Sequence, residues 1–200
     1  MKIYLASNSK GRAEVLTRAH INFEIIPTDV DETRIMNDSH LSVSEKVQRL
    51  SLLKTQAGTK TLSQAQLSQA FVIGGDTLFE INNELWGKPI DVDQARARLG
   101  QMRNRTGTIW TGLTLFHNNQ IITKLSTAQI KLASYSDVEI ERYLNTGEPM
   151  IAAGNFAIEG YGGPFIQSIR GDYFAIIGLS LVDLNDALHN LGFSVSDFWT

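Results

Sequence analysis

A single carboxylate interrupts an apolar stretch near the middle of the chain, and its position marks a candidate centre for chemistry. The stretch runs from Phe71 to Glu80, and Asp76 stands within it directly after Gly74 and Gly75. Because burial of an unpaired carboxylate is costly, we expect Asp76 to face a cation, a metal ion or a cluster of amide donors. The two glycines should let a ligand approach the strand backbone.

A lysine follows this predicted strand after a short turn. Asn82 and Asn83 are typical of a tight turn, and the segment Gly87-Lys88-Pro89 brings a cation back towards the end of the strand. A carboxylate and a lysine at neighbouring strand ends could hold a metal-bound polyphosphate. The alternative is a structural Asp76 at a bulge and a solvated Lys88.

A polar loop near the amino terminus is a second candidate site. Residues 3–6 read as a short strand and residues 13–19 as a helix, and the loop between them contains Ser7, Ser9, Lys10 and Arg12. The unpaired N–H groups and the positive dipole at the start of a helix favour an anion there. A well-capped helix with solvated cations is the alternative.

Carboxylates gather after the next predicted strand. Asp29, Asp31 and Glu32 could bind a divalent cation through oxygen or could simply lie in water. Ser42 and Glu45 form a capping-box pattern, which predicts a helix that continues past Lys54.

The remaining pattern alternates strands and helices and indicates an α/β fold. A second capping box begins at Ser136, and a glycine-rich run at residues 153–163 contains one charged residue, Glu159. The other predicted elements are helices at 91–99, 136–147 and 180–191 and strands at 21–26, 108–116, 120–125 and 169–179.

Composition narrows the functional classes. The chain has 200 residues, 42% of them hydrophobic, and a net charge of -3, which disfavours a broad basic surface for nucleic acid. It has no cysteine, no signal-peptide pattern and no apolar run of the roughly 18 residues that span a bilayer. We therefore expect a soluble cytoplasmic protein, with one domain over residues 1–200 and no membrane partner.

Several short segments, in order along nearly the whole chain, resemble the Maf family of nucleoside triphosphate pyrophosphatases. They are residues 5–12, 30–32, 75–77 with 87–89, 153–160 and 171–179. The resemblance implies a fold like that of the inosine triphosphate pyrophosphatases, with a long bent mixed sheet, flanking helices and two lobes around a cleft. It also implies a homodimer that uses Mg2+, Mn2+ or Co2+ to hydrolyse a nucleotide substrate to nucleoside monophosphate and pyrophosphate.

The resemblance assigns a role to individual residues of this sequence. It implies that Asp76 accepts a proton or binds metal, and that Glu32 serves the metal or the attacking water. Residues that match phosphate-binding, substrate-binding or specificity positions are Lys88, Arg12, Ser9, Lys54, Gly11, Thr77 and Glu159.

The sequence also departs from the family pattern. Gly11 replaces an arginine, Ile151-Ala152 replaces an Asp-Lys pair, and Gly107 replaces a histidine, so turnover could be weak. Glu159 stands where pyrimidine-preferring members carry glutamine. Because a carboxylate only accepts hydrogen bonds, it suits the paired donors of guanine, and we expect 7-methyl-GTP as substrate.

Two alternatives stay open. Thr77 resembles the pyrimidine branch of the family, which favours dTTP or UTP. A nucleotide-binding regulator of cell division or septum formation, with little turnover, is the alternative from a different functional class.

Overall fold

The computed structural model describes residues Met1–Trp199. The strands are β1 (Lys2–Ala6), β2 (Phe23–Ile25), β3 (Ala70–Ile81), β4 (Glu84–Trp86), β5 (Thr106–His117), β6 (Gln120–Leu132) and β7 (Ile166–Gly171). The α-helices are α1 (Lys10–Arg18), α2 (Thr33–Met36), α3 (Val43–Thr59), α4 (Gln64–Leu67), α5 (Val92–Met102), α6 (Asp137–Leu144), α7 (Glu148–Ile151), α8 (Tyr173–Ile177) and α9 (Leu181–His189). Three short 3-10 helices within the described residues are η1 (Ala153–Asn155), η2 (Gly163–Phe165) and η3 (Val195–Phe198).

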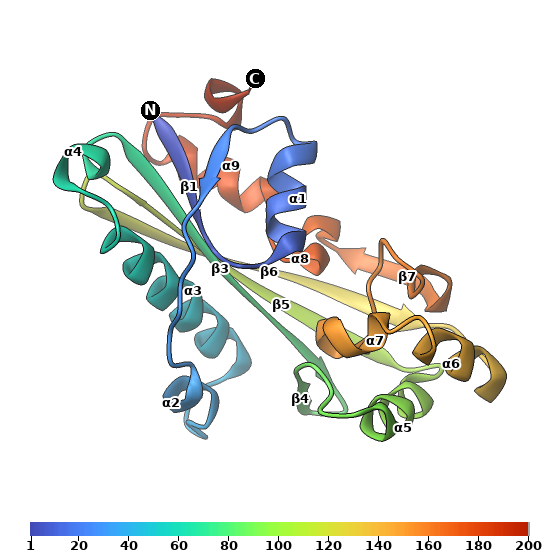
Figure 1. Cartoon of the computed structure of the whole chain (residues 1–200). Helices are drawn as coiled ribbons and strands as arrows, with labels where there is room; N and C mark the ends of the chain where they lie inside the picture. Colours follow the sequence, from blue (N-terminus) through green and yellow to red (C-terminus); the bar gives the residue numbers. More distant parts are fainter. Residues whose placement is uncertain (200) are drawn as a thin grey trace. The chain divides into compact units, whose positions relative to one another are not determined.

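The strands pair in both directions. Across residues 1–199 they form one seven-stranded sheet in the order β2-β1-β3-β5-β6-β7, with β4 paired to β3 (Figure 1). Strand β1 runs parallel to β2 and β3, whereas β3 and β4, and also β6 and β7, are antiparallel. The predicted α/β fold with a mixed sheet and flanking helices is confirmed.

The described chain divides into two compact units. Unit 1 comprises Met1–Thr77, Thr111–Ser126 and Ile177–Thr200, and unit 2 comprises Leu78–Trp110 and Thr127–Ile176. Strands β3, β5 and β6 each begin in one unit and end in the other.

Unit 1 has its strands between two helical layers. Helix α3 lies on one face of these strands, and α1 and α9 lie on the other (Figure 1). Strands β1 and β3 are therefore covered on both faces, and Ile3, Leu5, Phe71 and Ile73 are fully buried. Burial on both faces explains why these strands are nearly continuous apolar runs in the sequence.

Unit 2 has a core of aromatic and aliphatic side chains under three helices. Helices α5, α6 and α7 pack against one another. The Phe79 ring on β3 meets Trp86 and Phe156 edge-on, at centroid distances of 6.4 and 5.6 Å. Tyr135 and Tyr143 both contact the Phe165 ring.

The predicted capping boxes and asparagine turns are confirmed, whereas helix α1 begins at Lys10, before the predicted start at residue 13. Ser42 and Glu45 form a capping box at the start of α3, and Ser136 and Glu139 form one at the start of α6. The turn between β5 and β6 uses asparagines at positive φ, as does the turn between β3 and β4.

The prediction of a strand over residues 169–179 is wrong for most of its length. Strand β7 ends at Gly171, which has a φ of 118°, and helix α8 begins at Tyr173. The Asp172 carboxylate accepts hydrogen bonds from the backbone N–H groups of Phe174, at 2.8 Å, and Ala175, at 3.3 Å. This side-chain cap starts a helix within an apolar run that otherwise reads as a strand.

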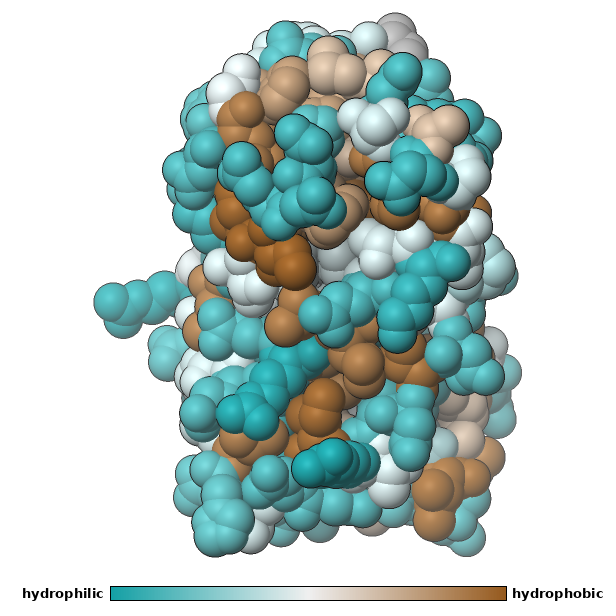
Figure 2. Space-filling view, turned by 90° about the vertical axis from the view of Figure 1, so that its left-hand side faces the viewer, coloured by the Kyte–Doolittle hydropathy of each residue, from teal (hydrophilic) through white to brown (hydrophobic). Residues whose placement is uncertain are grey.

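The surface is mixed in polarity. Figure 2 shows one face of the molecule, on which hydrophobic residues form patches among hydrophilic ones. Within residues 1–199, no helix combines the length and the apolar character that a membrane crossing requires.

Candidate active site

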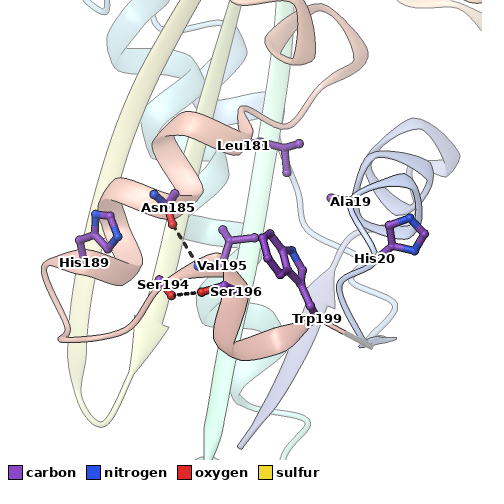
Figure 3. A pocket seen from close by; sticks show the side chains of 9 residues that line it. All are labelled: Ala19, His20, Leu181, Asn185, His189, Ser194, Val195, Ser196 and Trp199. Carbon is purple, nitrogen blue, oxygen red and sulfur yellow. Dashed lines mark hydrogen bonds between the residues drawn. The ribbon is translucent and has the colours of Figure 1, made fainter.

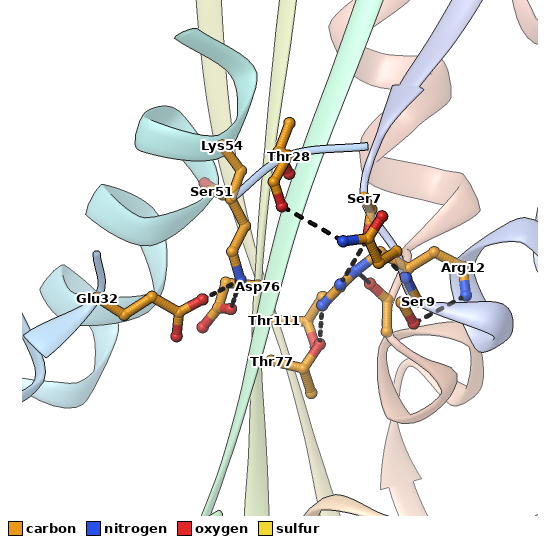
Figure 4. Close-up of polar contacts among 12 residues, drawn as sticks. Ser7, Ser9, Arg12, Thr28, Glu32, Ser51, Lys54, Asp76, Thr77 and Thr111 are labelled. Carbon is orange, nitrogen blue, oxygen red and sulfur yellow. Dashed lines mark hydrogen bonds and ion pairs between the residues drawn. The ribbon is translucent and has the colours of Figure 1, made fainter. Parts of the chain in front are cut away.

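A lysine joins two of the predicted carboxylates in unit 1 (Figure 4). Lys54 Nζ on α3 lies 2.6 Å from Asp76 Oδ1 on β3 and 2.8 Å from Glu32 Oε1. The side chains of Lys54 and Asp76 are 14% and 8% exposed, whereas that of Glu32 is 42% exposed. The expectation that Asp76 faces a cation is confirmed, and Glu32, Lys54 and Asp76 form one charged cluster.

The second oxygen of Asp76 has a different environment. Asp76 Oδ2 is buried and has no hydrogen-bond partner within the described chain. A buried carboxylate oxygen without a partner is unfavourable, and a hydrogen bond from water or a bound cation would satisfy it. Asp76 is thus held by Lys54 through one oxygen while the other can take part in chemistry.

Helix α3 reaches the cluster because it lies very close to β3. A Cβ on Gly74 would lie 2.3 Å from Thr55 Oγ1, so any side chain at Gly74 would push α3 away. Thr55 Oγ1 donates to the Thr114 carbonyl at 3.1 Å, and the hydroxyls of Ser51 and Thr114 are 2.8 Å apart. These contacts fix the turn of α3 that carries Lys54.

Arg12 occupies a buried position beside β3. Its Nε donates to the Gly178 carbonyl at 2.8 Å, Nη1 to Ser7 Oγ at 3.1 Å, and Nη2 to Thr77 Oγ1 at 3.1 Å (Figure 4). Arg12 is 7% exposed. Burial lowers the pKa of its guanidinium, whereas the charges of Asp76 and Glu32 raise it. The net effect is a lowered pKa, with burial as the largest cause.

The glycines before Asp76 serve the protein's own side chains. A Cβ on Gly75 would lie 2.8 Å from Arg12 Nε, and Gly74 makes room for Thr55. The sequence led us to expect that these glycines admit a ligand. In the structure, α3 and Arg12 take that space.

The amino-terminal loop ends in a helix cap. Ser9 is the N-cap of α1, and its Oγ accepts a hydrogen bond from the Arg12 N–H at 3.4 Å. A Cβ on Gly11 would lie 2.8 Å from the Ile177 carbonyl oxygen. Ser9 and Gly11 therefore set the course of the backbone at Arg12, and Lys10 is exposed.

Thr77 lies at the end of unit 1 and joins a short hydroxyl network. Its Oγ1 accepts from Arg12 and lies 3.1 Å from Thr111 Oγ1. Thr111 was not among the predicted residues, because an isolated threonine in an alternating strand has no sequence signal of its own.

Two predicted residues belong to unit 2. Lys88 follows β4 and is exposed. Glu159 is exposed in the glycine-rich loop, where its Oε1 accepts a hydrogen bond of 3.2 Å from the Tyr173 hydroxyl. That Lys88 and Glu159 act on the same substrate as the unit 1 residues stays a prediction.

The acidic residues after β2 have different partners. Asp31 Oδ1 accepts from the Thr33 N–H at 2.9 Å, at the start of α2, while Glu32 pairs with Lys54. The hydrogen bonds from Thr33 lower the pKa of Asp31. Among residues 1–199, no group of three or more histidine, cysteine or acidic side chains could hold a metal ion.

This donor set still fits one kind of metal. Mg2+ commonly binds through one or two carboxylates together with substrate phosphates, rather than in a cage made by the protein. Asp76, with its unpartnered oxygen, and Glu32 could supply such a pair.

A cavity of about 790 Å3 elsewhere in unit 1 does not have this chemistry (Figure 3). It is lined by two residues that follow α1, by residues of α9 and by the carboxyl-terminal segment. These are Ala19, His20, Leu181, Asn185, His189, Ser194, Val195, Ser196 and Trp199. None of these nine side chains is a carboxylate, a lysine or an arginine. The lining therefore offers no permanent charge for a metal-bound polyphosphate.

The fold and the charged cluster define an α/β protein with a lysine-bridged carboxylate pair beside a buried arginine. Residues 2–191 match the family model described as Maf-like protein. The chain belongs to the Maf family.

Curated relatives match over nearly their whole length. A nucleoside triphosphate pyrophosphatase of Corynebacterium glutamicum (strain R) is 39% identical, over 100% of this chain and 99% of the relative. A dTTP/UTP pyrophosphatase of Dictyoglomus thermophilum is 34% identical, over 97% of this chain and 98% of the relative. A dTTP/UTP pyrophosphatase of Aromatoleum aromaticum is also 34% identical, over 96% of each chain.

Proposed function

We propose that this protein is a nucleoside triphosphate pyrophosphatase, which hydrolyses the bond between the α- and β-phosphates and releases pyrophosphate. The observation that carries the proposal is the buried Asp76 carboxylate, with one oxygen held by Lys54 and the other without a partner. The names of the full-length relatives support the same activity.

Different side chains of unit 1 can carry out different parts of this reaction. Asp76 Oδ2 is an acceptor for a proton of the attacking water, and Lys54 holds the carboxylate in place. Arg12 and Lys54 offset the negative charge that grows on the phosphate oxygens. Asp76 and Glu32 would hold a divalent cation, Mg2+, Mn2+ or Co2+, which supplies Lewis acidity when bound.

The test is pyrophosphate release from a panel of nucleotides with Mg2+ or Mn2+. Replacement Asp76→Asn keeps the size of the side chain and removes its charge, and we expect release to fall by about 100-fold or more. Asp93→Asn is the matched control, because the Asp93 side chain is 93% exposed on α5. Full activity of Asp76→Asn would refute the proposal.

The metal can be tested without turnover. Since the chain offers two carboxylates and not a cage, calorimetry should detect weak Mg2+ binding to the protein alone, on the order of millimolar. Binding should tighten in the presence of a non-hydrolysable nucleotide, and Glu32→Gln should remove much of that gain.

For the base, we propose dTTP or UTP ahead of 7-methyl-GTP. Two of the relatives described above are named dTTP/UTP pyrophosphatases, and Thr77 resembles the same branch. The Glu159 carboxylate can accept one hydrogen bond from N3–H of uracil or thymine. The alternative substrate, 7-methyl-GTP, would offer it the two donors of guanine, which suit a carboxylate better. Comparing kcat/KM for UTP, dTTP and 7-methyl-GTP decides between them. Glu159→Gln should shift preference further towards UTP, and an unchanged ratio would show that Glu159 does not read the base.

A regulator that binds nucleotide with little turnover is the second candidate. It is favoured by the environment of Arg12, whose guanidinium is bonded to three protein groups, and by Gly11 in place of a second arginine. A thermal shift with nucleotides in the absence of pyrophosphate release would favour it. We also propose the homodimer, which light scattering after gel filtration tests directly.

A further inference from the structure

A tyrosine and a glutamate lie against the loop that carries Glu159, within unit 2. Tyr143, in the last turn of α6, is 3% exposed. Glu148 is the first residue of α7. The Tyr143 hydroxyl donates to Glu148 Oε1 at 2.7 Å, so the two side chains form one hydrogen-bonded pair.

The Glu148 carboxylate also binds the backbone of the loop. Oε1 accepts from the Gly162 N–H at 2.8 Å, and Oε2 accepts from the Tyr161 N–H at 2.9 Å. A Cβ on Gly160 would lie 2.0 Å from Oε2, so a side chain at residue 160 would have to displace the Glu148 carboxylate. Successive N–H groups aimed at one carboxylate make an anion-binding arrangement, here filled by the protein itself.

Tyr143 holds the other end of the same loop. Its hydroxyl oxygen accepts a hydrogen bond from the Ala157 N–H at 3.3 Å. The pair therefore binds segment 157–162 at its first residue and at its last two. Glu159 stands between these anchors, where the Tyr173 hydroxyl donates to its Oε1.

We propose that Tyr143 and Glu148 are positioning residues that fix segment 157–162 and thereby aim Glu159 at the nucleobase. The inference rests on the proposed function, because it gives Glu159 a base to read. It assigns no contact with substrate to Tyr143 or Glu148.

The hydrogen bonds between segment 157–162 and the side chains of Tyr143 and Glu148 form a clamp on this segment. The chemistry of the two side chains keeps this clamp in place. Burial, together with the hydrogen bond to Glu148, raises the pKa of Tyr143, so its hydroxyl remains a donor in neutral solution. A hydrogen bond from a hydroxyl to a charged acceptor is stronger than one between neutral groups. Removing the hydroxyl would leave Glu148 with one donor fewer and the Ala157 N–H without its acceptor.

The first experiment is Tyr143→Phe, made in the natural sequence and again in a Glu159→Ala background. We expect the kcat/KM ratio of UTP to GTP to change by about tenfold in the first, the size of one charge-assisted hydrogen bond, mainly through KM. In the Glu159→Ala background, Tyr143→Phe should leave the ratio unchanged. An equal effect in both backgrounds, or none in the first, would overturn the proposal.

Tyr135→Phe is the matched control. Tyr135 is also buried and contacts the same Phe165 ring, but its hydroxyl donates to the Leu99 carbonyl of α5 at 2.8 Å. A general loss of packing or stability would affect both variants, whereas the base preference should change only in Tyr143→Phe. The same change of preference in Tyr135→Phe would contradict a specific role for Tyr143.

The second experiment measures the clamp without turnover. In Glu148→Gln, one carboxylate oxygen becomes an NH2 group, which cannot accept from the loop. Hydrogen exchange at Tyr161 and Gly162 should accelerate by about tenfold or more, while Glu139→Gln on α6 should leave it unchanged. Unchanged exchange in Glu148→Gln would refute the clamp.

The two proposals can fail separately. If the natural protein releases pyrophosphate from no nucleotide, the proposed function fails, and the base preference is then taken from dissociation constants for the same nucleotides. A preference that Tyr143→Phe alters only when Glu159 is present would still support the positioning role. A base preference that neither Tyr143→Phe nor Glu159→Ala changes would overturn the positioning role.

Discussion

A Cβ on Gly11 would lie 2.8 Å from the carbonyl oxygen of Ile177 and 3.3 Å from its side chain. The first turn of α1 thus packs directly on the last residue of α8. The missing arginine of the family pattern cannot be restored here by a simple substitution.

We predict that Gly11→Arg loses stability, by about 1 to 3 kcal/mol, because the added side chain must displace fixed backbone. Pyrophosphate release should not increase. Urea unfolding and the release assay measure the two effects. Gly100→Ala in α5, where a Cβ meets open space, should instead gain about 0.5 to 1 kcal/mol. A stable and more active Gly11→Arg protein would contradict this.

Lys54 and Asp76 should be strongly coupled. Lys54→Met leaves a buried carboxylate without its cation, and we expect a loss of about 1 to 3 kcal/mol in unfolding free energy. Asp76→Asn in the same chain should recover part of that loss, since no charge is then left unpaired. A double-mutant cycle by urea unfolding measures the coupling energy. Additive effects of the two substitutions would argue against the ion pair.

Arg12 should not be replaceable by lysine. Its planar group bonds three acceptors in different directions, which one ammonium cannot reach with the same geometry. Arg12→Lys should reduce both stability and pyrophosphate release, the latter by about tenfold or more. Arg18→Lys, near the end of the same helix, is the control, because its ion pair with Glu14 is exposed. Comparable losses in both variants would refute a special role for Arg12.

We expect the free energy of unfolding to fall in strongly alkaline solution, because the buried hydroxyl of Tyr135 ionises there. Burial raises the pKa of Tyr135 to about 12, although the charge of Arg103 lowers it. A raised folded-state pKa stabilises the protein fully below the unfolded value of about 10, and this contribution disappears as the pH rises towards 12. Absorbance of tyrosinate during alkaline titration should show late ionisation from both Tyr135 and Tyr143, and Tyr135→Phe should remove the part that belongs to Tyr135. Early ionisation of all tyrosines in the folded protein would contradict the prediction.

The sequence was sufficient for the elements with strong local signals. Ser42 with Glu45 and Ser136 with Glu139 predict helix starts, because each capping box satisfies backbone groups within four residues. Residues 169–179 were predicted wrongly because the Asp172 cap lies inside an apolar run that has no distinct period.

The candidate site was predictable in its charges but not in its pairing. The isolated Asp76 indicates that a cation must be near, yet Lys54 is 22 residues away and only the packing of α3 on Gly74 brings them together. Likewise, the contact of Arg12 with Gly178 spans 166 residues. Such long-range contacts have no local signal, and the roles of Gly74 and Gly75 follow from them.

Unit 1 is made of three separate segments of the chain, and this has a consequence for its synthesis. Unit 1 includes Ile177–Thr200 as well as its amino-terminal segment, so it lacks part of its helical layer until α9 has left the ribosome. We expect the nascent chain to stay susceptible to proteases until then, because its first half cannot close its own core.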